Sequence, residues 1–233
     1  MSLRMVAQVH LEPDAAPDAR ETVAECLGRC ASDVDEIARA HAGLHLEGSV
    51  GGGDLTWDVL FRDEAALRAF FARVPDTHPD DLLPALGGPF EELSGSIDRI
   101  EAALVEPLAR HVGRPGLIGV KRTLWTRLLD DVPSEAVGVW ERAMQALPAE
   151  VPSIRNWSFS RIRTRPDGPC PVRWQHVWEQ EYESLAALEQ DYMASPYHWG
   201  HLDGFFDPES PRRIIDPWLA HLVCMETEGV LSW

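Results

Sequence analysis

A strand-like stretch opens each half of the chain. The two stretches are RMVAQVHL (4–11) and IGVKRTLWTRL (118–128). In the residues that follow each strand, apolar side chains recur at steps of three and four, the period of a helix with one buried face. The apolar positions are Val23, Leu27, Cys30, Val34 and Ile37 in the first half, and Val137, Trp140, Met144 and Leu147 in the second. Each half is therefore predicted to begin with a strand and an amphipathic helix.

A pair of strands joined by a turn is predicted next in each half. In the first half the strands are GLHLEGSV (43–50) and LTWDVLF (55–61), and in the second they are NWSFSRIR (156–163) and VRWQHVWE (172–179). The triple glycine before residue 54 lacks the helix and lysine that follow a phosphate-binding loop, so it is interpreted as a hairpin turn.

The two halves repeat one plan. The segment at 55–71 resembles the segment at 172–192, and a second helix and a final strand (SIDRIEAALV and IIDPWLAHLVCM) follow the hairpin in each half. The element order is thus β-α-β-β-α-β twice, the ferredoxin-like plan. A four-stranded sheet with helices on one face leaves the other face bare, and a second sheet can cover it.

We therefore predict an α+β protein built from tandem ferredoxin-like repeats that form an intrachain dimeric α/β barrel. The predicted domains are an N-terminal repeat at 1–105, a linker at 106–116 and a C-terminal repeat at 117–233.

Composition restricts the function classes. The 233 residues carry a formal net charge of −17, which repels nucleic acid and anionic lipid, so neither is an expected partner. No apolar run is long enough to span a bilayer, and the first residues lack a secretory signal, so a cytoplasmic location is expected. The four cysteines form no CxxC pair and are expected to be small buried residues.

The stretch SPYHWGHLDGFFDPE contains the clearest candidate chemistry. Ser195 and Pro196 are a helix start signal, because serine caps free N–H groups and proline suits the first helical position. In a helix from Pro196 to about Phe205, His198 shares the apolar face with Leu202 and Phe205. His201 lies on a different helix face, together with Tyr197. The two histidines are therefore not expected to act together or to bind one metal ion. His221 is the one further candidate ligand for such a metal.

These stretches resemble the stress-responsive dimeric α/β-barrel (Dabb) family. The similarity covers roughly 117–226 and rests on IGVKRTLWTRL, on the strand that runs into YESLAALEQDY, and above all on SPYHWGHLDGFFDPE. The family includes cofactor-free polyketide cyclases of the olivetolic acid cyclase type. The resemblance implies that His198 and Tyr192 are catalytic and that His176 lines the cavity. Arg122 stands where the cyclase has a histidine, which puts the same substrate in doubt.

The chemistry of this set is coherent. A histidine can remove a proton next to a carbonyl group, and a tyrosine hydroxyl or a guanidinium can stabilise the resulting enolate. Trp174 and Trp178 alternate with His176 onto one strand face and are candidate binding residues. Whether that face meets the helices or the cavity is left open by the pattern.

Three functions follow as hypotheses. The first is a cofactor-free acid/base enzyme, such as a cyclase, lyase or isomerase, acting on a small apolar or aromatic carbonyl compound. The second is a non-catalytic, stress-responsive protein that binds a small molecule in the same cavity. The third is an oxygenase or a haem-binding α/β-barrel protein with His198 or His201 as axial ligand. The chain is expected to be a monomeric pseudo-dimer or a homodimer.

The repeats differ in chemistry. Asp81 aligns with His198 and Phe71 aligns with Tyr192. The first half thus lacks both the base and the phenol, and we expect one functional pocket, in the second half.

Overall fold

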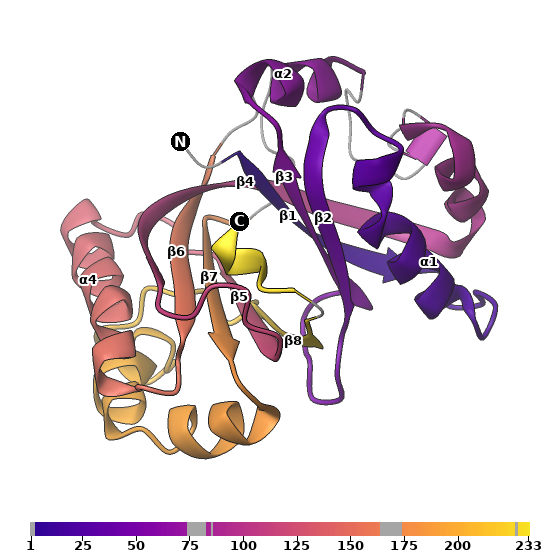
Figure 1. Ribbon diagram of the computed structural model, residues 1–233. Helices are drawn as coiled ribbons and strands as arrows, with labels where there is room; N and C mark the ends of the chain where they lie inside the picture. Colours follow the sequence, from indigo (N-terminus) through magenta and orange to yellow (C-terminus); the bar gives the residue numbers. More distant parts are fainter. Residues whose placement is uncertain (1–2, 74–82, 85, 164–173, 227) are drawn as a thin grey trace. The chain divides into compact units, whose positions relative to one another are not determined.

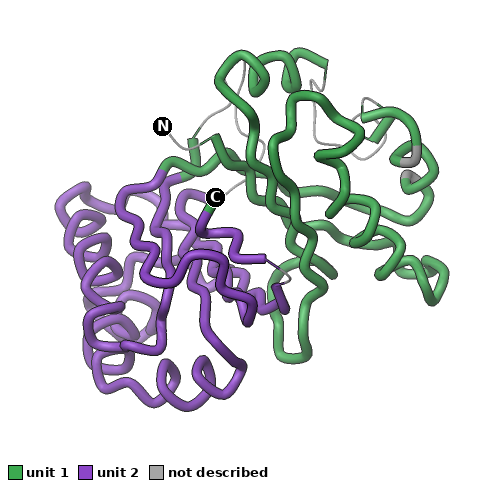
Figure 2. Tube along the Cα trace, viewed as in Figure 1, with its two compact units in different colours: residues 1–106, 162–173, 233 green, residues 107–161, 174–232 purple. Residues whose placement is uncertain are grey.

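The computed structural model describes the chain apart from residues 1–2, 74–82, 85, 164–173 and 227 (Figure 1). It divides into two compact units (Figure 2). Unit 1 comprises residues 1–106, 162–173 and 233, and unit 2 comprises residues 107–161 and 174–232.

Unit 1 has the predicted β-α-β-β-α-β order. Its elements are β1 (Arg4–Leu11), α1 (Ala19–Gly28), β2 (Ile37–Leu44), β3 (Leu55–Phe61), α2 (Glu64–Arg73) and β4 (Ile97–Val112). The strands lie in the order β2-β3-β1-β4 with antiparallel pairing of β1 to β3 and β4 and of β2 to β3. One face of this sheet packs on α1, α2 and the 3-10 segment η2 (Gly88–Ser96), which together bury an apolar core.

Unit 2 repeats the arrangement. Its elements are β5 (Val120–Thr126), α4 (Ser134–Glu150), β6 (Asn156–Arg163), β7 (His176–Tyr182), the helical segments η3 (Ala187–Tyr192), η4 (His198–Leu202) and η5 (Asp203–Phe205), and β8 (Ala220–Met225). The strand order is β6-β7-β5-β8, with antiparallel pairing of β7 to β5 and β6 and of β5 to β8. Figure 1 shows α4 and the segment that contains η3 to η5 next to these strands, and their apolar side chains form one core with the sheet.

The α+β class and the tandem ferredoxin-like architecture are therefore confirmed. In both units the first strand of the repeat lies between the third and the last, and the second strand pairs with the third, as this topology requires. The face-to-face packing of the two sheets into an intrachain barrel stays a prediction.

The first predicted helix was too long. α1 ends at Gly28, Cys30 lies in the short 3-10 segment η1 (Cys30–Ser32), and Ile37 already opens β2. The apolar period continues past the helix end because the chain turns back over the same core, where Cys30, Val34 and Ile37 are all buried. As a consequence, β2 occupies 37–44 rather than the predicted 43–50.

The predicted linker also takes another form. β4 continues through Val112, so residues 106–112 are strand residues rather than an extended connection. Their last part belongs to unit 2, where β4 neighbours β6 and Gly113 N–H donates to the carbonyl of Arg155 at 3.2 Å.

The triple glycine has a structural reason, as the sequence predicted. It lies in the connection between β2 and β3, and Gly51 has a φ of 76°, which favours glycine. A Cβ added at Gly53 would lie 2.1 Å from the carbonyl oxygen of Val9. Only glycine permits this approach, which lets Asp54 N–H donate to that oxygen at 2.7 Å.

Candidate functional site

Arg122 is the centre of a polar cluster on the helix-facing side of the unit 2 sheet. It lies on β5, directly opposite Gln180 on β7, and its Nη1 donates to Oε1 of Gln180 at 2.7 Å. Its Nη2 lies 3.3 Å from Nε2 of His221 on β8. Because a guanidinium only donates, Nε2 of His221 must accept, so the neutral imidazole carries its proton on Nδ1.

Two helical turns bring a phenol and an imidazole to this cluster. Tyr192 ends η3 and His198 begins η4, and both segments are π-helical, a rare geometry that is frequent at functional sites. Between them Ser195 Oγ accepts a hydrogen bond from His198 N–H at 3.4 Å, so the predicted serine cap is present. The capped helix start at Ser195 therefore lies between the two π-helical segments.

The predicted division of the two histidines is confirmed. Leu202 and Phe205 are buried in the core of unit 2, and His198 lies against Tyr192 with 4.8 Å between ring centroids. His201 instead stacks on Tyr197 at 4.6 Å and is exposed. Tyr197 in turn donates from its hydroxyl to the carbonyl of Ala143 on α4 at 3.2 Å.

Arg122, Tyr192 and His198 thus lie together. The guanidinium carbon of Arg122 lies 4.7 Å from the ring centroid of Tyr192, a cation–π distance. The ring of Tyr182, which is fully buried, lies 6.4 Å from that of Tyr192. The result is a cation, two phenols and an imidazole within an otherwise apolar core.

The surroundings of His198 keep its imidazole neutral, the form that can accept a proton. Burial and the nearby charge of Arg122 lower the pKa of His198 below its usual 6.5, so the imidazole is neutral at pH 7. Its Nδ1 is buried and has no hydrogen-bond partner among the described residues. Burial raises the pKa of Tyr192 above 10, so this phenol stays protonated and can donate a hydrogen bond. Burial and Arg122 lower the pKa of His221 to about 3.

His176 does not join this cluster. It lies at the other end of β7, where its ring stacks on Phe159 at 5.5 Å and meets Trp140 edge-on at 4.7 Å. Its Nε2 lies 3.0 Å from Oε1 of Glu141, which also receives two hydrogen bonds from Arg161 at 2.8 Å. Burial lowers the pKa of His176, and the residue belongs to a buried cluster beside α4.

The two predicted tryptophans separate. Trp178 lies on the helix-facing side of β7, with its ring 5.7 Å from Phe159 and 5.5 Å from Trp157. Trp174 precedes β7 and lies against Trp125 at 6.2 Å. Because Leu124 faces the helices, the alternation of β5 points Trp125 to the opposite face. The expectation that Trp174 shares a face with Trp178 was therefore wrong: strand alternation begins only at His176.

The first half lacks an equivalent cluster in its described part. The helix-facing residues of β1 are Met5, Ala7 and Val9, all apolar and buried, where β5 presents Arg122. Phe71 packs on Phe61 and Phe70 at 6.1 and 5.3 Å. Asp81, the counterpart predicted for His198, lies outside the described residues.

Within the described residues, no group of three or more His, Cys, Asp or Glu side chains is placed to hold a metal ion. Among the described cysteines, Cys26, Cys30 and Cys224 form no disulfide. None of the described helices combines the length and hydrophobicity needed to cross a membrane.

Sequence reasoning missed Gln180 and His221 as partners of Arg122. A signal for both exists in the ferredoxin-like strand order, which places β5 between β7 and β8. Gln180 is the direct pairing partner of Arg122, and His221 lies diagonal to it, two residues from the paired Val223 on the same face.

Comparisons with known proteins agree with this fold. The chain resembles the crystal structure of an anthrone oxidase-like protein with 12% identity and a TM-score of 0.59, over 97% of this chain and 93% of that one. A protein from Lactobacillus acidophilus NCFM, provisionally named a monooxygenase, matches with 11% identity and a TM-score of 0.52 over 97% of both chains. A variant of chlorite dismutase from Candidatus Nitrospira defluvii matches with 10% identity and a TM-score of 0.51, over 99% of this chain and 94% of that one.

A search of curated proteins finds no significant match. At these identities the structural similarities establish the fold, which extends over both halves. The family comparison is local: residues 120–216 match the family model of the Stress responsive A/B Barrel Domain, Dabb. The C-terminal half of this chain therefore carries a Dabb domain, within a full-length tandem ferredoxin-like fold.

Proposed function

We propose that unit 2 is an acid/base enzyme that removes a proton from a carbon next to a carbonyl group. The substrate is a small apolar or aromatic compound. The observation that carries the proposal is the neutral imidazole of His198, whose buried Nδ1 has no partner among the described residues, beside Tyr192 and Arg122.

In this proposal His198 accepts the proton. The negative charge that develops on the carbonyl oxygen is stabilised by the guanidinium of Arg122 and by the hydroxyl of Tyr192, which its raised pKa keeps protonated. The apolar core around these groups strengthens both interactions, because water would otherwise screen them. Gln180 and His221 position Arg122 through the contacts at 2.7 and 3.3 Å.

The enolate has two chemical fates, which define two candidate reactions. It can attack a second carbonyl group of the same molecule and close a ring, the reaction type of polyketide cyclases that the Dabb resemblance suggests. Return of the proton from His198 would complete this reaction without an external oxidant.

The second candidate is oxygenation of the same enolate. The names of the structural relatives, an anthrone oxidase-like protein and a provisional monooxygenase, favour it. An activated methylene group would react with dioxygen to give a carbonyl group and water, so that one oxygen atom enters the product and the other leaves as water. His198 serves both reactions through the same proton removal.

A haem at this site fits the packing poorly. The His198 ring lies between the rings of Tyr192 and Trp199, at centroid distances of 4.8 and 5.1 Å, with cationic Arg122 nearby. His201 is stacked on Tyr197. Both imidazoles are thus packed against neighbouring aromatic rings. An absorption spectrum of the purified protein checks this, since bound haem would give a Soret band.

The proposal is tested by incubating the protein in D₂O with a panel of aromatic ketones and 1,3-dicarbonyl compounds. Proton removal exchanges deuterium into the acidic carbon, which mass spectrometry detects whichever fate follows. An oxygen electrode then separates the two candidates, because only oxygenation consumes dioxygen. Exchange that is equal in the wild-type protein and in His198→Ala would refute the proposed base and favour a non-catalytic binding protein.

A further inference from the structure

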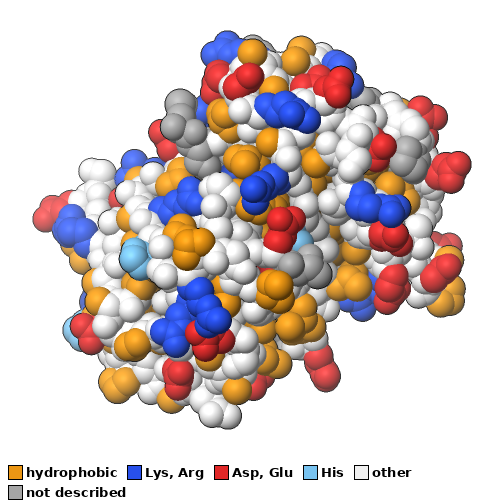
Figure 3. Space-filling model, viewed as in Figure 1, with side chains coloured by type: hydrophobic (Ala, Val, Ile, Leu, Met, Phe, Trp, Pro, Cys, Tyr) orange, Lys and Arg blue, Asp and Glu red, His pale blue; other side chains and the backbone are white. Residues whose placement is uncertain are grey.

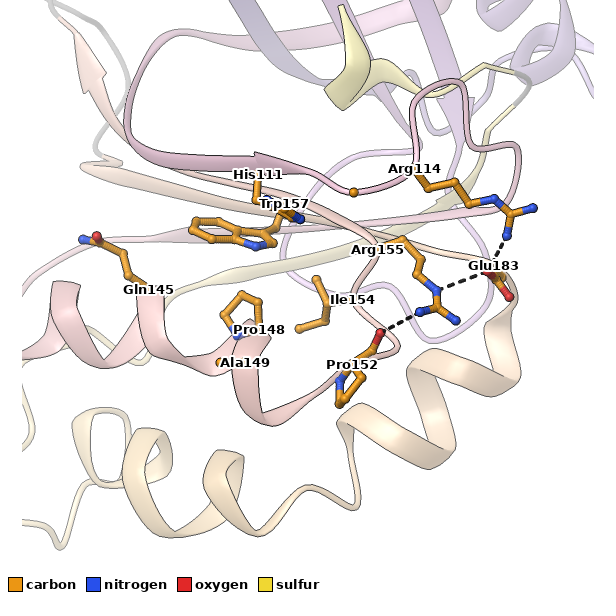
Figure 4. Close-up of a pocket in the computed structure, with 11 residues that line it drawn as sticks. His111, Arg114, Gln145, Pro148, Ala149, Pro152, Ile154, Arg155, Trp157 and Glu183 are labelled. Atoms are coloured by element: carbon orange, nitrogen blue, oxygen red, sulfur yellow. Dashed lines mark hydrogen bonds and ion pairs between the residues drawn. The ribbon is translucent and has the colours of Figure 1, made fainter.

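Unit 2 contains a second candidate site, away from His198. A cavity of about 630 Å³ lies between the last turns of α4, the segment that leads into β6, and the end of β4 (Figure 4). None of its lining residues belongs to the cluster around Arg122. Its lining includes Arg114, Arg155, Glu183, Trp157, Ile154 and Pro148.

The floor of this cavity is apolar and partly aromatic. Figure 4 shows the indole of Trp157 on β6, with Pro148 and Ala149 of α4 opposite and Ile154 beside it. Trp157 is only partly buried, and its ring centroid lies 5.5 Å from that of the buried Trp178. A flat apolar body can therefore lie on a fixed indole face, as stacking requires.

One end of the cavity carries two arginines. Nη1 of Arg114 donates to Oε1 of Glu183, and Nε of Arg155 donates to the same oxygen at 3.1 Å (Figure 4). Nη1 of Arg155 also donates to the carbonyl of Pro152 at 3.1 Å. Two guanidinium groups thus share one carboxylate and leave a net positive charge at this end.

Both guanidinium groups keep donors for a ligand. Within the part of the chain that the structure describes, no hydrogen bond engages Nη2 of Arg155 or Nε and Nη2 of Arg114. The backbone of Arg114 is held by the fully buried Asn156, whose Oδ1 accepts from Arg114 N–H and whose Nδ2 donates to its carbonyl, both at 2.8 Å. The backbone that carries Arg114 is therefore fixed before any ligand arrives.

We propose that this cavity binds a small aromatic carboxylate, with its carboxylate on Arg114 and Arg155 and its ring on Trp157. Carboxylates pair with guanidinium groups through two parallel hydrogen bonds, which suits the free donors. The two guanidinium groups hold the anionic group at their end of the cavity, which leaves the apolar body beside Pro148 and Ala149. The site is independent of the function proposed for His198.

The experiment titrates the full-length protein with 2-naphthoate by isothermal titration calorimetry. Methyl 2-naphthoate and inorganic phosphate are the two control ligands, because one lacks the charge and the other lacks the ring. We expect 2-naphthoate to bind at least about tenfold more tightly than either, since a charge-assisted hydrogen bond commonly contributes that much.

Four variants locate the binding. Arg155→Gln and Trp157→Ala should each weaken 2-naphthoate binding by about tenfold or more, whereas Arg142→Gln, at an exposed arginine of α4, should leave it unchanged. Glu183→Gln should tighten binding, because it removes the carboxylate that competes for both guanidinium groups. If these residues had a purely structural role, Glu183→Gln would also weaken 2-naphthoate binding.

Two outcomes would overturn the proposal. Equal binding of the ester and the acid would show that the arginines are not used. Loss of binding in Arg122→Gln but not in Arg155→Gln would place the ligand in the cluster around His198 instead. Circular dichroism of each variant confirms that it is folded.

Discussion

Nη2 of Arg122 lies 3.3 Å from Nε2 of His221, so a permanent cation lies against a histidine whose pKa is lowered by burial and by this charge. The same charge lowers the pKa of His198. Replacement of Arg122 by glutamine should therefore raise the pKa values of both histidines towards 6.5. Histidine resonances followed by NMR during a pH titration measure this. His45 in unit 1, whose pKa does not depend on Arg122, is the internal reference, and unshifted values for His198 and His221 would contradict the assigned geometry.

Loss of the proposed base should abolish turnover without loss of the fold. We expect His198→Ala to reduce the rate of deuterium exchange by about 100- to 10,000-fold, the usual range for a general base. Tyr192→Phe should also slow exchange, because the enolate oxygen loses a donor. His201→Gln is the matched control, since His201 is exposed and stacks on Tyr197. Asp81→Ala should stay near the wild-type rate if the second half alone carries the chemistry.

The free energy of unfolding should decrease as the pH is lowered, because two histidines are buried in their neutral form. Burial lowers the pKa of His45 to about 4 and that of His221 to about 3. The unfolded chain then binds protons at these sites below about pH 6.5 while the folded protein does not, so the free energy of unfolding decreases as pH falls from 6.5 towards these values. Each unit of pKa difference corresponds to about 1.4 kcal/mol before solvent screening is allowed for.

Urea unfolding at several pH values measures this dependence. His221→Gln should flatten the decrease between pH 6.5 and 4, since glutamine can accept the hydrogen bond from Arg122 but does not titrate. If the free energy of unfolding of the variant falls with pH as steeply as that of the wild-type protein, His221 is not held in its neutral form by burial.

Gly119 should tolerate no side chain. A Cβ at this position would lie 2.1 Å from the carbonyl oxygen of Tyr182, a contact that forces β5 and β7 apart. We expect Gly119→Ala to destabilise the protein by about 1–3 kcal/mol or more. Gly200→Ala is the control: nothing lies within 4 Å of its Cβ position in η4, and alanine there should be neutral or stabilising. Equal unfolding midpoints for the two variants would contradict the close approach.

The chain should not bind duplex DNA or RNA at physiological salt. Its net charge of −17 opposes any phosphate backbone. On the face shown in Figure 3, Lys and Arg side chains are scattered among Asp and Glu and do not merge into a continuous stripe. Fluorescence anisotropy with a labelled duplex tests this, and a submicromolar complex would refute it.

Local patterns by themselves determined most of the fold. The strand at 4–11, the face of α4 formed by Trp140, Met144 and Leu147, and the helix start at Ser195 were all predicted, because period and capping depend on residues close in the chain. The repeated order of these elements was enough to identify two ferredoxin-like halves. That His198 and Tyr192 belong to one site was implied by the resemblance alone.

Only the tertiary structure decided which strand residues meet. The approach of His221 and Gln180 to Arg122 depends on β5 lying between β7 and β8, a long-range pairing. His176 shares a strand with Gln180 yet pairs with Glu141 of α4, because strand position along the sheet, not strand face alone, sets its neighbours. The end of α1 at Gly28 was missed for a related reason: a chain that leaves a helix but keeps covering the same core retains its apolar period.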